Sequence, residues 1–214
     1  MTAFVDYIID KDYVDSQKIC ITGSSMGGYT CWAQAVMYRK KFAAAVICCG
    51  GGFTLSGGEC LCQAEFCKQL LIECKNHGLN TAVDTCGNVP WTSIESVIPY
   101  TDTFLFDVKA IDDDIHIKCT GVSNKLILSN LKKLDEQGAS IEIRIPYVPK
   151  FNACDIKNIA EFVNGLKNVK KVRVLPYHNY ASGKYSALNM TDKLPDVLPA
   201  KSEIAAAQNF FYKR

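Results

Sequence analysis

Strand-like apolar segments and amphipathic helical segments alternate along most of the chain, and this alternation constrains the fold more than any other feature of the sequence. The strand-like segments are rich in β-branched and aromatic residues, and each is followed by apolar residues at helical spacing. They read KICITG, FAAAVICC, TAVDTCG, TFLFDVKA, IEIRIPYVP and VRVLPYH. The pattern predicts an α/β fold with a parallel sheet and crossover helices, either open or curved into a partial barrel.

The helices expected between the later strands occupy residues 60–78, 91–98, 124–137 and 156–166. The first of them ends in Gly78, a residue suited to a helix C-cap. Neither an internal repeat nor a low-complexity tract interrupts the alternation. The sequence therefore predicts a regular succession of strand and helix from the N-terminal segment onward.

A GxSxG sequence occupies residues 23–27, between an expected strand and an expected helix. Small residues around the serine allow the sharp turn that exposes a nucleophilic hydroxyl, which makes Ser25 a candidate nucleophile. The surrounding segment, residues 14–52, resembles the matching stretch of α/β-hydrolase esterases of the dienelactone-hydrolase type. Such a hydrolase also needs an upstream oxyanion loop and a downstream acid and histidine, and neither is recognisable here. The favoured interpretation is therefore that Ser25 is a turn residue that lacks a catalytic base.

The composition is that of an ordinary soluble globular protein, with 48% hydrophobic and 21% charged residues over 214 positions. A net charge of +2 gives no basic surface of the kind that binds nucleic acid or an anionic membrane. No segment approaches the roughly 18 to 20 apolar residues that span a bilayer. The 11 cysteines are an odd number and favour reduced thiols, so we expect a cytoplasmic protein.

Polar residues gather where the predicted strands of the larger part end. These residues are Glu59, Asp84, Thr85, Asp107, Lys109, Arg144 and His178. The carboxyl ends of parallel strands form one edge of a sheet or barrel, so these side chains are expected to lie together. Asp107 and Lys109 share one face of their strand, while Phe104 and Phe106 share the other and would pack against helices. Such a pair is either a structural salt bridge or a site for a zwitterionic ligand.

Six segments in order carry a specific resemblance: LSGGE, DTCG, FLFDVKAID, TGVSNKLILSNL, RIPYVP and LPYHNY. Over residues 53–190 the chain resembles the radical-SAM activating enzymes of glycyl-radical enzymes, the family of the pyruvate formate-lyase activating enzyme. The resemblance implies a partial (β/α) barrel, S-adenosylmethionine and a 4Fe-4S cluster as cofactors, and a glycyl-radical enzyme as partner. In such enzymes the cluster reduces S-adenosylmethionine, and the resulting deoxyadenosyl radical abstracts hydrogen from a glycine of the partner.

The resemblance also implies roles for individual residues. It assigns cofactor binding to Gly57, Gly58, Glu59, Asp107, Lys109, Arg144 and His178. Within this set, Glu59 and its glycines resemble the site for the amino group, Lys109 resembles the residue that meets the carboxylate, and His178 lines the nucleoside side. Asp84, Thr85 and Asp107 resemble a monovalent-cation site beside that carboxylate.

The cysteines depart from the family pattern, because the CxxxCxxC motif that holds the cluster is absent. Cys60, Cys67 and Cys74 recur every seven residues on the helix expected over 60–78. Successive members would stand roughly 10 Å apart along the axis and could not share one cluster. They are interpreted as small buried hydrophobes, and no iron-sulfur ligands are identified.

The sequence thus predicts two parts: a hydrolase-like βαβ fragment over 1–52 and, over 53–214, a partial radical-SAM barrel that lacks its first unit. The chain is expected to bind S-adenosylmethionine weakly, without assembling a normal cluster or generating the radical. One alternative is a serine esterase acting through Ser25. Another is a non-catalytic remnant that docks a glycyl-radical enzyme.

Overall fold

The structure is a computed structural model, and it describes residues 20–23, 44–47, 53–56, 58–178 and 197–211. Its main feature is a five-stranded parallel sheet in the order β3, β4, β5, β6, β7. The strands are β3 (Phe53–Leu55), β4 (Thr81–Thr85), β5 (Thr103–Asp107), β6 (Ile141–Tyr147) and β7 (Val169–Pro176). Neighbours in the sheet are also neighbours in the chain, so every connection is a crossover, as the alternation predicted.

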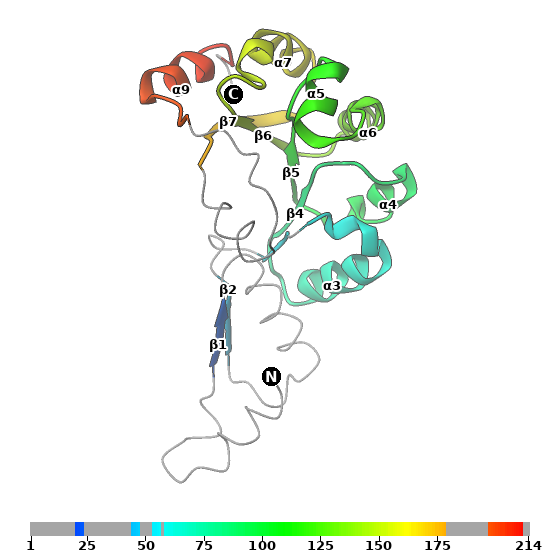
Figure 1. The fold of residues 1–214 in the computed structure, drawn as a ribbon. Helices are drawn as coiled ribbons and strands as arrows, with labels where there is room; N and C mark the ends of the chain where they lie inside the picture. The colour runs from blue at the N-terminus through cyan, green and yellow to red at the C-terminus, as the bar shows by residue number, and fades with distance from the viewer. Residues whose placement is uncertain (1–19, 24–43, 48–52, 57, 179–196, 212–214) are drawn as a thin grey trace.

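The helices lie outside the sheet and follow the strands around it (Figure 1). They are α3 (Ala64–Asn76), α4 (Trp91–Glu95), α5 (Asp113–Thr120), α6 (Lys125–Glu136), α7 (Ile156–Asn164) and α9 (Lys201–Gln208). Short 3-10 turns complete the connections: η2 (Cys60–Gln63), η3 (Ile98–Tyr100) and η4 (Ala153–Asp155). The arrangement confirms the predicted α/β class and the partial barrel.

The N-terminal part contributes a separate two-stranded parallel sheet of β1 (Cys20–Gly23) and β2 (Ala44–Ile47). Both strands were predicted from the sequence, and their parallel pairing agrees with the expected βαβ unit. The helix expected between them, together with Ser25, lies outside the described residues. None of the helices in the described part of the chain is long and apolar enough to cross a membrane.

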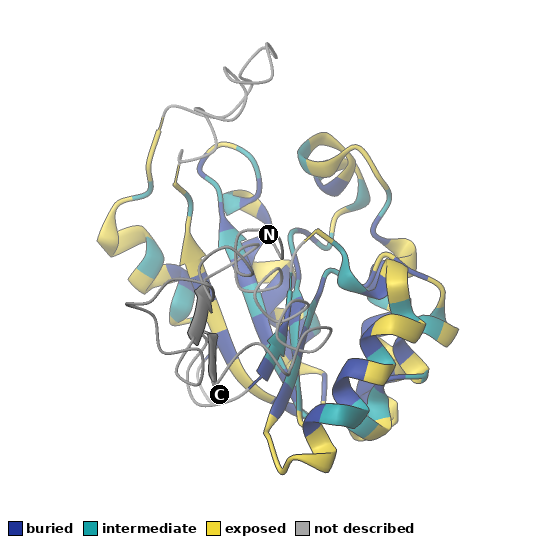
Figure 2. Cartoon of the chain, turned by 90° about the horizontal axis from the view of Figure 1, so that it is seen from below, coloured by how far each residue is buried: buried dark blue, intermediate teal, exposed yellow. Residues whose placement is uncertain are grey.

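The core lies between the sheet and its helices, as the buried inner surfaces in Figure 2 show. β5 illustrates how the sequence builds it: Phe104, Phe106 and the following Val108 are at most 1% exposed, whereas Asp107 and Lys109 are only half-buried. Alternate side chains of a strand point to opposite faces, so this segment covers the core with one face and presents charge on the other. The predicted division of the two faces is confirmed.

Two helices differ from what the sequence predicted. The expected helix over 60–78 begins only at Ala64, because Gln63 leaves helical geometry (φ −116°, ψ 51°) after the separate turn η2. Cys60 therefore does not continue the stripe of Cys67 and Cys74. Instead the Cys67 thiol lies 3.1 Å from the carbonyl oxygen of Cys60. Cys67 and Cys74 are 2% and 1% exposed, which confirms their role as buried small hydrophobes.

The second correction concerns α5, which the sequence analysis did not predict. The helix has only eight residues, and a single one of them, His116, is buried, so its apolar periodicity is weak. Its ends carry recognisable signals. The Asp112 side chain accepts a hydrogen bond from the Ile115 amide (2.9 Å), and Gly121 ends the helix in the left-handed region (φ 83°).

Candidate functional site

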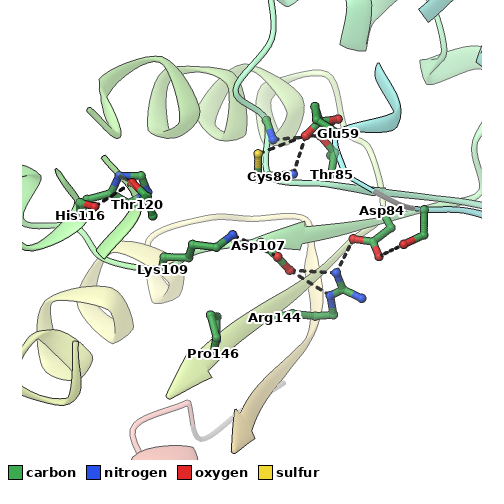
Figure 3. Close-up of polar contacts among 12 residues, drawn as sticks. Glu59, Asp84, Thr85, Cys86, Asp107, Lys109, His116, Thr120, Arg144 and Pro146 are labelled. Atoms are coloured by element: carbon green, nitrogen blue, oxygen red, sulfur yellow. Dashed lines mark hydrogen bonds and ion pairs between the residues drawn. The ribbon is translucent and has the colours of Figure 1, made fainter. Parts of the chain in front are cut away.

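Polar side chains meet at the carboxyl ends of β3 to β6, and we call this group the rim. It consists of Ser56, Glu59, Asp84, Thr85, Cys86, Asp107, Lys109 and Arg144. Figure 3 shows the members of this group that it labels, which come from neighbouring strands. The sheet register explains why they meet, since Asp107 pairs directly with Arg144 and Asp84 lies one strand further. The edge predicted to carry the chemistry therefore does bring most of the candidate residues together.

Arg144 is the centre of an ionic network on the rim. Its guanidinium contacts Asp84 Oδ1 and also donates to Asp107 Oδ1, with Nη2 at 2.9 Å and Nε at 3.1 Å. Asp107 uses its other oxygen for the Lys109 ammonium (3.2 Å). Asp84 uses its other oxygen to accept from the Ser56 hydroxyl (2.6 Å). Two carboxylates and two cations thus alternate along three strands.

This network is only partly shielded from solvent, with side-chain exposures of 22% for Arg144, 16% for Asp84 and 25% for Asp107. Burial alone would lower the pKa of Arg144, but the Asp107 and Asp84 carboxylates outweigh it and raise that pKa. Arg144 is therefore a permanent cation held between two carboxylates.

Glu59 anchors a second network, built mainly from donors of the β4 end. Its carboxylate accepts from the Thr85 hydroxyl (2.9 Å to each oxygen), the Cys86 amide (2.9 Å) and the Leu61 amide (3.1 Å). The Cys86 thiol lies 3.2 Å from the same carboxylate. Burial is the main reason that the pKa of Cys86 is raised, and the hydrogen bond to Glu59 raises it further. This thiol therefore stays protonated at neutral pH.

Glycine shapes the rim at two points. Gly58 has φ +57°, a value that side-chain-bearing residues rarely adopt, and it directly precedes Glu59. Gly87 has φ +72°, and a Cβ at this position would lie 2.3 Å from the Phe106 ring. The loop after β4 therefore approaches the core closely enough to require glycine. Gly57 lies outside the described residues.

Several residues that support the rim were missed by the sequence analysis. Asn130, which is fully buried on α6, donates to the carbonyls of Gly87 (2.9 Å) and Val89 (2.8 Å) and so holds the loop after β4. Asn124 similarly holds the loop after β5, by donating to the carbonyls of Ala110 and Ile111. Both residues belong to the TGVSNKLILSNL segment, which was quoted only for its resemblance. Their pairing with loops distant in sequence gives no local signal.

Two histidines, the candidate His178 and His116, have different places in the structure. His178 follows β7 and its side chain is exposed, so its place on the nucleoside side of a ligand stays a prediction. His116 is buried, and its Nδ1 lies 2.8 Å from the Val122 carbonyl oxygen and 3.1 Å from the Thr120 hydroxyl. His116 thus stabilises the end of α5, and Figure 3 shows its contact with Thr120.

The rim presents a carboxylate and an ammonium at one edge, the two charges that the zwitterionic methionyl group of S-adenosylmethionine requires of a site. Glu59 and Lys109 offer these opposite charges, and the Lys109 side chain keeps 30% of its surface exposed. A 4Fe-4S cluster finds no such fit: among the described residues, no three His, Cys, Asp or Glu side chains converge as a metal site. Cys31, Cys48 and Cys49 lie outside the described residues.

Comparison with protein-family models gives two matches. The Radical SAM superfamily model matches residues 36–163, and the prolyl oligopeptidase family model matches residues 1–52. The second match supports the hydrolase-like N-terminal fragment. Because the two matches overlap over residues 36–52, the boundary between 52 and 53 stays a prediction.

Individual relatives point the same way. The trans-4-hydroxy-L-proline dehydratase activating enzyme of Clostridioides difficile is 45% identical over 144 residues, which are 65% of this chain and 47% of that protein. A pyruvate formate-lyase-activating enzyme of Staphylococcus aureus (strain USA300) is 36% identical over 182 residues, 81% of this chain and 71% of that protein. A solved domain of the pyruvate-formate lyase-activating enzyme from Bacteroides vulgatus has a TM-score of 0.63 at 30% identity, covering 76% of this chain and 93% of the domain.

The chain belongs to the radical SAM superfamily and, within it, to the family of glycyl-radical-enzyme activating enzymes. The superfamily uses S-adenosylmethionine and a 4Fe-4S cluster. The chain spans about half the length of some curated relatives, namely 47% of the trans-4-hydroxy-L-proline dehydratase activating enzyme and 46% of a choline trimethylamine-lyase activating enzyme. The resemblance stated from the motifs is thereby confirmed.

Proposed function

We propose that the rim binds the methionyl group of S-adenosylmethionine, and that the chain is an activating-enzyme relative whose radical chemistry is impaired. One observation carries the binding proposal: Glu59 and Lys109 present opposite charges on one edge of the sheet, each held by neighbouring groups. A zwitterionic ligand needs this combination, because each of its charges must exchange water for a partner.

Lys109 would receive the ligand carboxylate. Its ammonium has three donors, and the bond to Asp107 uses one of them, so others remain for an incoming carboxylate. Glu59 would receive the ligand ammonium. Its two oxygens already accept bonds from the Thr85 hydroxyl, the Leu61 amide and both the amide and the thiol of Cys86. These four donors orient the carboxylate, and the ligand ammonium would take the place of the weakest of them, the Cys86 thiol. Gly57 and Gly58 would let the ligand approach the backbone beside Glu59.

Asp84, Thr85 and Asp107 are proposed as a monovalent-cation site next to the ligand carboxylate. The two carboxylates already attract a cation, since the Arg144 guanidinium lies between them. Arg144 is therefore proposed to release one of them when a cation and ligand bind. His178 is proposed on the nucleoside side of the ligand, at the end of the β7 segment.

The binding proposal is tested by isothermal titration calorimetry with S-adenosylmethionine. Lys109→Ala is expected to weaken binding by about tenfold, since it removes a charge-assisted hydrogen bond. Lys125→Ala serves as the matched control, because the Lys125 side chain is 85% exposed and its ammonium lies 3.8 Å from the Asp113 carboxylate, outside the rim. Equal affinity of both variants would refute the role of Lys109, and no binding by the unchanged chain would refute the proposal.

The partner is proposed to be a glycyl-radical enzyme, as the names of the relatives suggest. When S-adenosylmethionine and a reduced 4Fe-4S cluster are bound, they supply the radical that such an activation needs. We propose that this chain does not complete the reaction, because CxxxCxxC is absent from the sequence. The cytoplasm, where thiols stay reduced, is its proposed location.

Anaerobic reconstitution with iron and sulfide tests the impairment, followed by electron paramagnetic resonance and an assay for reductive cleavage of S-adenosylmethionine. We expect neither a cluster signal that responds to the ligand nor cleavage. Cleavage by the reconstituted chain would show that cysteines outside the family motif hold a cluster. Pull-down of pyruvate formate-lyase without its activation would instead support the non-catalytic docking remnant.

A second candidate function rests on the prolyl oligopeptidase match over residues 1–52 and on the GxSxG sequence within it. In this alternative, residues 1–52 act as a hydrolase fragment beside the barrel-like part over 53–214, and Ser25 is the nucleophile of an esterase. Turnover of a p-nitrophenyl ester that disappears in Ser25→Ala would support it. Turnover that persists in Ser25→Ala would exclude Ser25 as its source.

A further inference from the structure

The segment between β6 and α7, residues 148–155, folds into a tight turn beside the rim. Lys150 has φ 66°, a left-handed conformation that is uncommon outside glycine and needs support from its surroundings. The Val148 carbonyl accepts from the amides of Phe151 (3.1 Å) and Asn152 (3.2 Å). The Asn152 side chain closes the turn, because its oxygen accepts from the Val148 amide at 2.8 Å.

The same turn reaches across to the segment that carries Lys109. The Asn152 amide group donates to the carbonyls of Lys109 (2.7 Å) and Pro146 (2.6 Å), and so ties the ends of β5 and β6 together. Three residues further on, the Asp155 carboxylate accepts from the amides of Ile111 (2.5 Å) and Asp112 (3.1 Å). Asn152 is 3% exposed and Asp155 is 1% exposed.

These bonds hold three backbone groups within residues 109–112, all on the carboxyl side of β5. Buried hydrogen bonds of this kind are expensive to lose, because the groups left behind have no water to replace the partner. Asp155 is a buried carboxylate, and its oxygen Oδ1 also accepts from the Asn158 side chain (2.6 Å). The backbone of Lys109 is therefore held by a different loop from the one to which it belongs.

We infer that Asn152 and Asp155 are positioning residues that fix Lys109 for the ligand carboxylate. The inference rests on the proposed binding of S-adenosylmethionine at the rim. A lysine has four rotatable side-chain bonds, and a mobile backbone would add to the freedom lost when it binds. With residues 109–112 held, only the side chain remains to be ordered. Neither positioning residue needs to touch the ligand.

Asp135 offers a matched control at the opposite end of the sheet. It is also buried, at 8% exposure, and its carboxylate accepts from two successive backbone amides, those of Lys167 (3.0 Å) and Asn168 (2.6 Å). Asp155→Asn and Asp135→Asn make the same chemical change to the same kind of contact. The two variants should lose comparable stability. A difference between them in ligand affinity therefore shows that the location of the lost contact, next to Lys109 or far from it, matters for binding.

The experiment compares these two variants of the full chain by calorimetry with S-adenosylmethionine, well below both melting temperatures. Asp155→Asn should weaken binding by about tenfold, and Asp135→Asn should leave it within about twofold. Amide hydrogen exchange over residues 109–115 provides the second measurement, and only Asp155→Asn should accelerate it. Equal effects of both variants on binding, or unchanged exchange in Asp155→Asn, would overturn the inference.

The two measurements separate this inference from the proposed function. If the unchanged chain does not bind S-adenosylmethionine, the proposed function and the ligand role of Lys109 both fail. The exchange rates would still decide whether Asn152 and Asp155 hold the backbone of residues 109–112. If Asp155→Asn does not fold, Asn152→Ala replaces it. Its control is Asn168→Ala, which removes a side-chain bond to the Asp135 carbonyl (2.7 Å) at the opposite end.

Discussion

Carboxylates lie at both ends of the parallel sheet, but they have different partners at each end. At the carboxyl ends of the strands, Asp84 and Asp107 contact the charged side chains of Arg144 and Lys109. At the amino ends, Asp135 accepts from the amides of Lys167 and Asn168, and Asp102 accepts from the amide of Thr81 (2.8 Å) as well as from the Lys75 ammonium (2.6 Å).

The difference shows which end can exchange partners. Backbone amides at the start of a strand cannot move without disrupting the sheet, so these contacts give Asp135 a structural role and fix one side of Asp102, whose other partner is Lys75. Side-chain cations can rotate away, so Asp84 and Asp107 can give up a protein partner for a ligand or a metal cation. A carboxylate at the end of a strand is therefore better evidence of a binding site when no backbone amide holds it.

The largest effect is expected from a comparison of two glycines, one at each end of the sheet. Gly87→Ala should destabilise the fold by about 3 kcal/mol, because the new Cβ would lie 2.3 Å from the Phe106 ring in a left-handed backbone. Gly138 has φ +76° but open space around it, so Gly138→Ala should lose only about 1 kcal/mol. Urea unfolding measures both, and equal losses would contradict the close packing of Gly87.

Removal of the central cation should have the next largest effect. Arg144→Met leaves Asp84 and Asp107 without their shared partner, and we expect a loss of about 2 kcal/mol at pH 7. Potassium chloride should restore part of this stability, whereas choline chloride at equal ionic strength should not. Such recovery would support the proposed cation site of Asp84, Thr85 and Asp107.

Arg173→Met is the control for this prediction. Arg173 pairs in register with Arg144 on the next strand and contacts the Glu142 carboxylate, but 52% of the Arg173 side chain is exposed, against 22% for Arg144. Its loss should be below about 1 kcal/mol, as is usual for exposed ion pairs. Equal losses of unfolding free energy in Arg144→Met and Arg173→Met would show that the Arg144 network stabilises the fold no more than an ordinary ion pair.

A smaller effect is expected at the amino end and should depend on pH. The bond from Lys75 (2.6 Å), together with bonds from Thr81, lowers the pKa of Asp102 below its ordinary value of 3.8. Its stabilisation is therefore complete above pH 3.8 and is lost as the pH falls through the lower folded pKa. Asp102→Asn should lose about 1 kcal/mol at pH 7, after discounting for the 40% exposure of the side chain.

This pH dependence can be checked by urea unfolding of both proteins between pH 7 and pH 2. The stability difference between the unchanged chain and Asp102→Asn should shrink as the pH falls below 3.8. A difference that stays constant over this range would mean that the Asp102 charge is not what stabilises the start of β4.

The smallest effect concerns the reactivity of a rim thiol. Burial raises the pKa of Cys86, so iodoacetamide at pH 8 should label the exposed Cys62 and Cys154 before Cys86. Mass spectrometry of peptides taken over time gives the order. Labelling of Cys86 first would mean that the rim is less shielded than the described contacts indicate.

Much of the fold follows from local patterns in the sequence. Alternation in β5 correctly placed Phe104 and Phe106 in the core and Asp107 on the opposite face, because a strand repeats every two residues. The same kind of reasoning was wrong at Cys60, where the Glu59 side chain binds the Leu61 amide and a separate turn forms before α3. It also missed α5, whose short helix buries a single residue.

The sequence by itself determined the order of the strands and of most helices, the faces of the strands and the end of the sheet at which polar residues gather. These features depend on periodicity and on the direction of the chain, which neighbouring residues set. Only the tertiary structure decided that Arg144 lies between Asp84 and Asp107, and that Asn152 and Asp155 hold residues 109–112. Those contacts join segments some 37 to 60 residues apart, so they depend on strand register and loop packing, which no local pattern encodes.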